Sequence, residues 1–176
     1  MKKMWKSLLV SALLVLMCCF SAVVVSAATS SGTYPTRKGT ILVTSDAYKN
    51  LIPTGHAAIV WNKSKVVESV SKGVVYGKNN WKSTKKKVYG VTVKSTSAAQ
   101  DAKAAEYCAK QIGKKYNYNY LNMSTRKNFY CSQLVWAAFY DLYRINLNTS
   151  AYTNKAIHPM ELVNTSKTSL IYKYSR

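Results

Sequence analysis

Acidic residues, histidines and cysteines are all scarce in this sequence. Of its 176 residues only six are Asp or Glu, against 26 Lys and Arg, and the formal net charge is +20. The two histidines, His56 and His158, lie far apart along the chain, and the four cysteines form no CxxC pair. These shortages exclude the usual structural zinc sites. We therefore expect neither a metal nor any other cofactor.

The first 27 residues have the pattern of a secretory signal peptide. Lys2, Lys3 and Lys6 precede an apolar run over 8–25, and small residues follow up to Ala27. A signal peptidase cleaves after such small residues. A retained membrane anchor is the alternative, but we favour cleavage near Ala27. This predicts a secreted or cell-wall-associated protein with a single domain after the signal peptide.

The excess of positive charge limits the choice of partners. A field of this sign concentrates anionic molecules near the surface. The sequence carries no recognised nucleic-acid-binding motif, and an exported protein rarely meets nucleic acid. We therefore expect anionic wall polymers or lipid headgroups as partners, and no nucleic acid. Alternatively, the lysines serve solubility alone, since apart from 85–87 they are scattered.

Short runs with strand character precede and follow two helices. Residues 28–38 are rich in Ser and Thr and predict a linker or extended arm, and the domain itself spans 39–176. Five runs have the composition or alternation of strands: GTILVT (39–44), GHAAIVW (55–61), KVVESV (65–70), KKVYGVTVK (86–94) and SLIYKY (169–174). The order predicts an α+β fold with a small, mostly antiparallel sheet.

The first helix has clear start and stop signals. Ser97 with Gln100 three residues later is a capping box, and Gly113 is a stop signal. Helical spacing predicts one apolar face made of Ala98, Ala102, Ala105, Ala109 and Ile112. Cys108 lies beside this face, and we interpret it as a small, buried core residue.

The second helix begins near Cys131, in the stretch NFYCSQLVWAAFYDLY (128–143). The positive end of a helix dipole and a nearby imidazolium both lower the pKa of a thiol, and the thiolate is the nucleophile. A Cys/His pair of this kind attacks amides and esters. The alternative is a disulfide between Cys131 and Cys108 in an exported, non-catalytic wall-binding module.

A predicted β-hairpin supplies the imidazole and a carboxylate. If residues 62–64 form a three-residue loop, Ala58 faces Glu68. His56 and Glu68 then lie diagonally on one face with Cβ atoms roughly 7 Å apart, which allows Glu68 to orient the imidazole as the third member of a triad. A loop one residue longer or shorter would separate them to opposite faces. The alternative for Glu68 is an edge-strand charge facing water.

Three motifs together resemble a known family. GHAAIV, then VVES with Glu68 twelve residues after His56, then YCSQLVWAAF at Cys131 are similar to the circularly permuted branch of the NlpC/P60 superfamily, the YiiX-like or YycO-like papain-like proteins. The usual order of cysteine before histidine is reversed here, as in that branch. The resemblance implies a permuted papain-like fold in which a small antiparallel sheet packs against helices.

The resemblance also implies roles for individual residues. Cys131 would be the nucleophile, His56 the general base and Glu68 the third polar residue, while Tyr130 and Tyr116 would line the substrate cleft. The implied function is an exported thiol hydrolase that cleaves amide bonds, with cell-wall (peptidoglycan) peptides as the expected substrate. The alternative within the same fold is a hydrolase or acyltransferase that acts on acyl lipids.

Overall fold

The computed structural model describes residues 28–47, 55–151 and 156–176. The predicted signal peptide, residues 1–27, lies outside this part of the chain. Within the described residues, no helix is both long enough and apolar enough to cross a bilayer.

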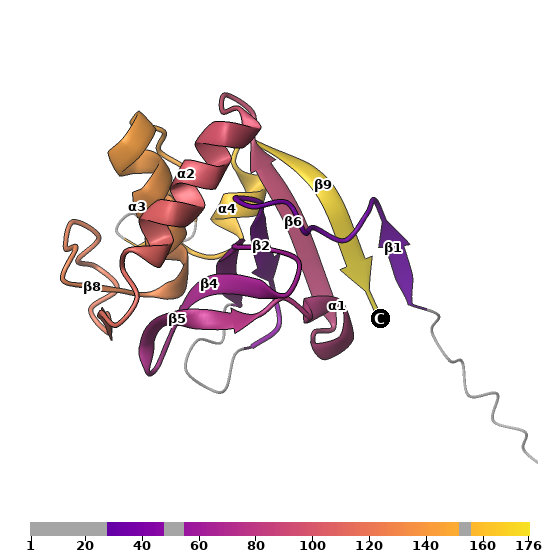
Figure 1. Ribbon diagram of the computed structural model, residues 1–176, viewed down its shortest axis with the longest axis horizontal. Helices are drawn as coiled ribbons and strands as arrows, with labels where there is room; N and C mark the ends of the chain where they lie inside the picture. The colour runs from indigo at the N-terminus through magenta and orange to yellow at the C-terminus, as the bar shows by residue number, and fades with distance from the viewer. Residues whose placement is uncertain (1–27, 48–54, 152–155) are drawn as a thin grey trace, which may run out of the picture.

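The described chain forms a seven-stranded sheet with helices against it (Figure 1). The strand order is β1-β9-β6-β2-β3-β4-β5, and every pair of neighbours is antiparallel. The strands are β1 (Thr29–Ser31), β2 (Ile41–Thr44), β3 (His56–Val60), β4 (Lys65–Val70), β5 (Gly73–Lys78), β6 (Lys87–Val93) and β9 (Thr168–Ser175). The α+β prediction with a mostly antiparallel sheet is confirmed.

Four helices and a small second sheet complete the described part. The helices are α1 (Trp81–Thr84), α2 (Ala98–Ala109), α3 (Cys131–Tyr143) and α4 (Glu161–Asn164). Two short parallel strands, β7 (Lys115–Tyr116) and β8 (Asn128–Phe129), flank the loop before α3. The long helices α2 and α3 lie side by side against one face of the sheet (Figure 1).

Both faces of the central strands are buried, because alternate side chains enter two different clusters. Ile41, Val43, Ala57 and Ile59 pack against α2 and α3 in the larger cluster. Leu42, Ala58, Val60 and Val66 point to the opposite face, where Trp81, Tyr172 and Tyr174 cover them. This explains why β2 and β3 are apolar along nearly their whole length in the sequence. The helix that begins at Cys131 packs directly against β3.

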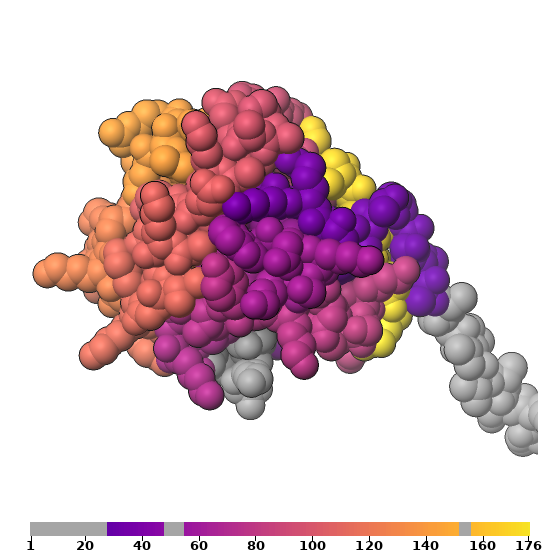
Figure 2. All heavy atoms as spheres, in the orientation of Figure 1, coloured from indigo at the N-terminus to yellow at the C-terminus, as the bar shows by residue number. Residues whose placement is uncertain are grey.

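Residues 28–38 pack against the domain. The sequence analysis predicted a linker or an extended arm for this segment. β1 pairs with β9 at the edge of the sheet. The Tyr34 hydroxyl donates to Asn79 Oδ1 at 2.8 Å, and the Tyr34 ring meets that of Tyr172 edge-on at 5.3 Å. In the space-filling view this segment runs over the surface from β1 towards the middle of the face (Figure 2).

The capping box that starts α2 is present. The predicted apolar face is right for Ala105, which is buried, and for Ala109, which packs against the core, but it is shifted as a whole. Ser97 Oγ accepts from the Gln100 amide, and Gln100 Oε1 accepts from the Ser97 amide. The buried residues of α2 are Asp101, Ala104, Ala105 and Cys108, whereas Ile112 lies beyond the helix and is 40% exposed. The face is displaced because Arg37 and Thr96 bind the Asp101 carboxylate, and a paired carboxylate can be buried.

Candidate active site

Cys131 is the first residue of α3 and is fully buried. The preceding Tyr130 is extended, with φ −89° and ψ 170°, so the unpaired N–H groups of the first helical turn and the positive end of the dipole surround the thiol. Burial raises the pKa of Cys131, but a hydrogen bond with His56 and the charge of His56 outweigh this effect. With further help from backbone N–H groups, the pKa of Cys131 lies below its ordinary value, which favours the nucleophilic thiolate.

His56 is the first residue of β3, and a glycine sets its position. Gly55 has φ 104°, and a Cβ atom there would lie 2.2 Å from the Thr44 carbonyl oxygen. Only glycine fits such a left-handed and close-packed position. The Gly-His pair of the sequence therefore marks the point where the chain enters the sheet beside the end of β2.

The hairpin brings His56 and Glu68 together as the register predicted. Ala58 pairs with Glu68, Ile59 with Val67, and His56 Nε2 lies 2.6 Å from Glu68 Oε2. Burial lowers the pKa of His56, but hydrogen bonds with Cys131 and Glu68 and the charges of both raise it to about 9. The imidazole is therefore held as a cation at neutral pH.

One imidazole ring connects the thiol to the carboxylate. Because Nε2 faces Glu68, the interaction with Cys131 has to use Nδ1. The structure thus brings together Cys131 from α3, His56 from β3 and Glu68 from β4. Such an arrangement supports a thiolate–imidazolium pair whose ring orientation is fixed by the carboxylate.

Two residues that the sequence analysis missed, Gly77 and Trp81, pack around His56 and Glu68. Glu68 Oε1 lies directly over Gly77 of β5, where a Cβ atom would be only 1.8 Å from that oxygen. On another side, the Trp81 ring lies against the His56 ring, with centroids 5.5 Å apart and planes tilted by 30°. Trp81 is buried and its backbone N–H donates to Tyr34 at 2.9 Å. Excluding water in this way strengthens the His56–Glu68 interaction.

The two tyrosines predicted to line the cleft have different surroundings. The Tyr130 hydroxyl accepts a hydrogen bond from the Ile157 amide at 2.9 Å, and burial above all raises the pKa of Tyr130 to about 12. The buried Tyr116 hydroxyl has no partner in hydrogen-bond geometry among the described residues, although Tyr120 lies close enough to influence it. Burial and then the charge of Cys131 raise the pKa of Tyr116.

Gln133, two residues after Cys131 in α3, holds the loop 117–126. Its side chain is fully buried. Oε1 accepts from the Tyr130 amide and from Asn117 Nδ2, and Nε2 donates to three carbonyl oxygens of the loop, those of Asn122, Met123 and Thr125. This one amide therefore fixes the loop relative to the start of α3.

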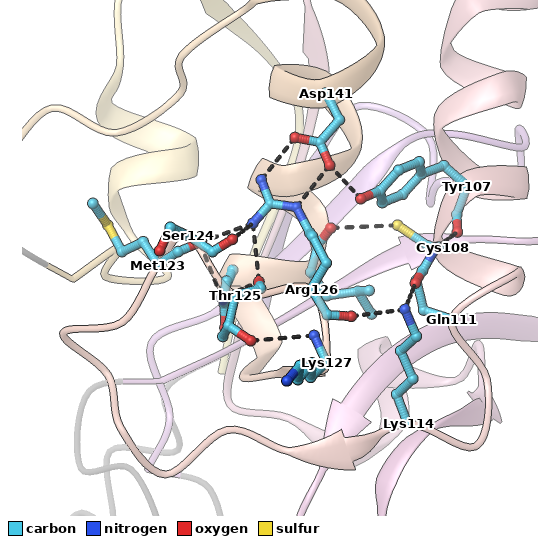
Figure 3. A network of polar contacts seen from close by, with 12 residues as sticks. Tyr107, Cys108, Gln111, Lys114, Met123, Ser124, Thr125, Arg126, Lys127 and Asp141 are labelled. Atoms are coloured by element: carbon cyan, nitrogen blue, oxygen red, sulfur yellow. Dashed lines mark hydrogen bonds and ion pairs between the residues drawn. The ribbon is translucent and has the colours of Figure 1, made fainter.

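Arg126 fastens the same loop from its outer side (Figure 3). Its guanidinium binds Asp141 of α3 through Nε and Nη2, both at 2.7 Å. Nη1 donates to the carbonyl oxygens of Met123, Ser124 and Thr125. Two exposed apolar side chains, Tyr118 and Leu121, thus sit on a loop that is held at several points.

The segment after α3 supports the start of that helix from the other side. Ser132 Oγ donates to the Ile157 carbonyl at 2.6 Å. Glu161 is fully buried, and its carboxylate accepts from the His158 amide, the Ala151 amide and the Thr149 hydroxyl. Burial lowers the pKa of His158, and its Nδ1 accepts from the Met160 amide. The second histidine thus contributes to this turn, and His56 is the one coupled to Cys131.

Both cysteines in the described residues are free thiols. Cys108 is buried as predicted and donates to the Leu134 carbonyl oxygen at 3.6 Å (Figure 3). Burial raises the pKa of Cys108, so this thiol stays protonated while that of Cys131 ionises more easily. The Cys108–Cys131 disulfide of the alternative hypothesis is not formed.

The reversed order of the histidine strand and the cysteine helix, on this antiparallel sheet, defines the class of permuted papain-like proteins. The comparison with family models agrees, because residues 41–171 match the model described as permuted papain-like amidase enzyme, YaeF/YiiX, C92 family. The chain therefore belongs to this family of cysteine-type amidases.

Two individual proteins are similar to the chain. The uncharacterized protein YycO of Bacillus subtilis (strain 168) is 30% identical over 151 residues, which cover 81% of this chain and 59% of that protein. The chain thus spans only about 59% of the length of the curated relative. The crystal structure of YiiX from Escherichia coli O157:H7 aligns with a TM-score of 0.58 and 16% identity over 77% of this chain and 96% of that one.

The YiiX protein is described as a metalloprotein. Among residues 28–47, 55–151 and 156–176 of the present chain, no three His, Cys, Asp or Glu side chains come together as metal ligands would. The likeness to that structure therefore supports the fold.

Proposed function

We propose that this protein is a cysteine amidase in which Cys131 is the nucleophile, His56 the general base and acid, and Glu68 the group that orients His56. The observation that carries the proposal is the arrangement of the three side chains: Cys131 begins α3 and bonds with His56, whose Nε2 lies 2.6 Å from Glu68 Oε2. In keeping with it, the pKa of Cys131 is lowered and that of His56 is raised to about 9. Opposed shifts of this kind are what a thiolate–imidazolium pair requires. Membership of the amidase family supports the same reaction.

The reaction follows from these positions. The Cys131 thiolate attacks the amide carbon, and the carbonyl oxygen becomes an oxyanion. His56 then transfers its proton to the leaving amine as the C–N bond breaks, which leaves a thioester on Cys131 and a neutral imidazole. Water, deprotonated by His56, attacks the thioester and releases the carboxylic acid. The proton returned to His56 restores the starting ion pair.

Two donors are available for the oxyanion. The backbone N–H of Cys131 lies at the unpaired start of α3. The second is the Tyr116 hydroxyl, which has no partner in hydrogen-bond geometry among the described residues and whose pKa the charge of Cys131 helps to raise. A preorganised donor of this kind contributes on the order of 10²–10³ in rate. In this assignment Tyr116 contacts substrate, while Tyr130 holds the segment at Ile157.

The proposed substrate is an amide bond of a cell-wall peptide, met by a secreted or wall-associated protein. The signal-peptide pattern of residues 1–27 supports export, and the net charge of +20 supports residence among anionic wall polymers or lipid headgroups. A second candidate is an acyl-lipid substrate. The exposed Tyr118 and Leu121, 59% and 63% accessible on the loop held by Gln133, favour it, because such side chains suit an apolar partner.

The test compares the purified protein without residues 1–27 on muropeptides and on acyl esters. We expect release of amines from muropeptides, and we expect the Cys131→Ala variant to lose this activity completely. Cys108→Ala is the matched control, since it removes the other thiol but should leave hydrolysis in place. Equal cleavage by the protein with and without the Cys131 thiol would refute the mechanism, and cleavage of esters alone would favour the lipid candidate.

A further inference from the structure

The last strand of the large sheet, β5, has an edge that faces away from its neighbour β4 (Figure 1). In an antiparallel pair, successive residues point their N–H and C=O groups alternately towards the partner strand and away from it. The Val74 N–H donates to the Lys114 carbonyl at 2.8 Å, and the Val74 carbonyl accepts from the Gly113 N–H at 3.0 Å, so both point away from β4. The backbone groups of Tyr76 and Lys78 therefore point outwards as well.

The edge is closed at Val74 and open further along. Among the described residues, the outward N–H and carbonyl groups of Tyr76 and Lys78 have no hydrogen-bond partner. Both residues are exposed. The open stretch ends at Asn79, whose N–H points back and donates to the Ser64 carbonyl at 2.9 Å. Unpaired backbone groups on an edge strand can pair with a further strand.

A hollow lies along this open stretch. Its volume is about 500 Å³, and residues 64–65 and 76–80 line it. Ligand pockets typically have roughly 300–1,000 Å³. The Tyr76 ring packs against Trp61 with centroids 5.7 Å apart, and the Lys38 ammonium lies 3.9 Å from the Trp61 centroid. The aromatic wall is therefore already held in place, which reduces the entropy lost when a ligand binds.

Two lysines in the lining of the hollow have the same charge at close range. Lys65 and Lys78 lie directly opposite each other in the β4–β5 pair, at a position where the Cα atoms approach to about 4.5 Å. Like charges placed opposite each other are destabilising. Among the described residues, neither lysine forms an ion pair and no acidic residue lines the hollow. A carboxylate between the two ammonium groups would replace their repulsion by two attractions.

A free edge could also pair with the same edge of a second copy. That pairing would bring the positive charges of two identical edges together, and lysines on edge strands oppose it. The charge of Lys65 and Lys78 therefore favours a partner with carboxylates over a second copy of this chain.

We propose that the open edge of β5, from Tyr76 to Lys78, binds an extended acidic peptide that adds to the sheet as a further antiparallel strand. The outward N–H and carbonyl of Lys78 bond the backbone of one peptide residue. A glutamate at that residue lies on the same face as Lys65 and Lys78 and reaches their ammonium groups. The inference goes beyond the proposed hydrolysis and does not depend on it, because Cys131 and His56 take no part in the binding.

The charge requirement is tested with a short, fluorescently labelled peptide of alternating glutamate and valine and with its glutamine counterpart. Each is titrated into the Cys131→Ala protein and followed by anisotropy. We expect the glutamate peptide to bind about fivefold more tightly, the upper end for an exposed ion pair. In Lys65→Gln/Lys78→Gln this preference should disappear. The matched control Lys103→Gln/Lys110→Gln removes two exposed charges at α2, and the preference should remain. Equal binding of both peptides to the protein with all its lysines would overturn the proposal.

The pairing of backbones is tested by N-methylation of the same peptide. Methyl groups on the glutamate amides, which face β5, should abolish binding, whereas methyl groups on the valine amides, which face water, should not. Binding should also slow hydrogen exchange of the Tyr76 and Lys78 amides, measured by NMR. Binding that leaves these amides unprotected, or that tolerates both methylation patterns, would refute strand addition. Protection that rises with protein concentration and needs no peptide would mean that a second copy occupies the edge, and would also overturn the proposal.

Discussion

At the residue scale, the carboxylate of Glu68 reaches His56 through space that Gly77 leaves open. Gly77 is not among the glycines with positive φ, so alanine suits its backbone and would act through its methyl group alone. That methyl group would overlap Glu68 Oε1 and push the carboxylate away from His56. We expect Gly77→Ala to reduce kcat/KM on the order of tenfold or more. The upper limit of this loss is the factor of about 10²–10⁴ that a positioned acid–base group supplies.

A double-mutant cycle tests whether Gly77 acts through Glu68. In a Glu68→Ala background no carboxylate remains for the new methyl group to displace, so adding Gly77→Ala should change activity little further. Additive losses in the two backgrounds would show that Gly77 contributes to β5 in another way. The upper limb of the pH–rate profile provides a second readout, because His56 without its carboxylate partner should lose its proton at lower pH.

The two thiols should respond differently to pH. The lowered pKa of Cys131 and the raised pKa of His56, about 9, predict an ion pair that forms above the Cys131 value and is lost as pH rises through about 9. Alkylation of the native protein should therefore show a thiolate well below the ordinary cysteine pKa of about 8.5. Only Cys131 should react, because burial raises the pKa of Cys108, and both should react after unfolding. A His56→Ala variant that alkylates with an unchanged pH profile would contradict the coupling.

At the element scale, the start of α3 depends on the amide side chain of Gln133. Gln133→Leu keeps the volume but removes the acceptor of the buried Tyr130 amide. It also removes one donor to each of the carbonyl oxygens of Asn122, Met123 and Thr125, which keep their bonds to Asn117 and Arg126. An unpaired buried amide costs about 1–3 kcal/mol, so we expect lower stability and faster amide hydrogen exchange across 117–126. Gln111→Leu is the control, since among the described residues the Gln111 side chain bonds the Tyr107 carbonyl and the Lys114 ammonium, both outside 117–126. Unchanged protection of the loop in Gln133→Leu would contradict this role.

The sequence predicted those elements whose signals are local. The apolar runs and the three-residue turn at 62–64 were enough to place β3 and β4 in register, and so to pair His56 with Glu68. The change from polar loop to apolar helix was enough to place Cys131 at the start of α3. In each case the deciding interactions lie within a few residues or one hairpin.

Features that depend on distant contacts escaped prediction. The buried face of α2 is displaced because Asp101 pairs with Arg37, 64 residues earlier, and hydrophobic periodicity carries no trace of that pairing. Gly77 and Gln133 gave no local signal either, since their importance comes from Glu68 and from a loop. For Glu161 the sequence did hold one clue. The chain has only six acidic residues, and a carboxylate placed within an apolar stretch needs a partner if it is buried.

At the scale of the whole molecule, each of the six acidic side chains has an ion-pair or hydrogen-bond partner. Arg37, Lys38, Arg126 and His56 pair with four of the six carboxylates. Asp46 accepts from the backbone amides of Lys86 and Lys87, and Glu161 is surrounded by donors from its own turn. Among the described residues, lysines therefore far outnumber the carboxylates that could pair with them, and their mutual repulsion opposes the compact state.

This imbalance predicts how salt acts on stability. Raising ionic strength from 0.01 to 0.15 M shortens the Debye length from about 30 Å to about 8 Å, which screens repulsion among exposed lysines more than the few close ion pairs. We expect the thermal midpoint to rise by a few degrees, since about 1 kcal/mol corresponds to about 2–4 °C for a domain of this size. Calorimetry in NaCl and in tetramethylammonium chloride separates screening from specific ion effects, because both salts should act alike. A midpoint that falls with ionic strength would mean that the paired carboxylates, and not the lysine field, dominate the electrostatic free energy of folding.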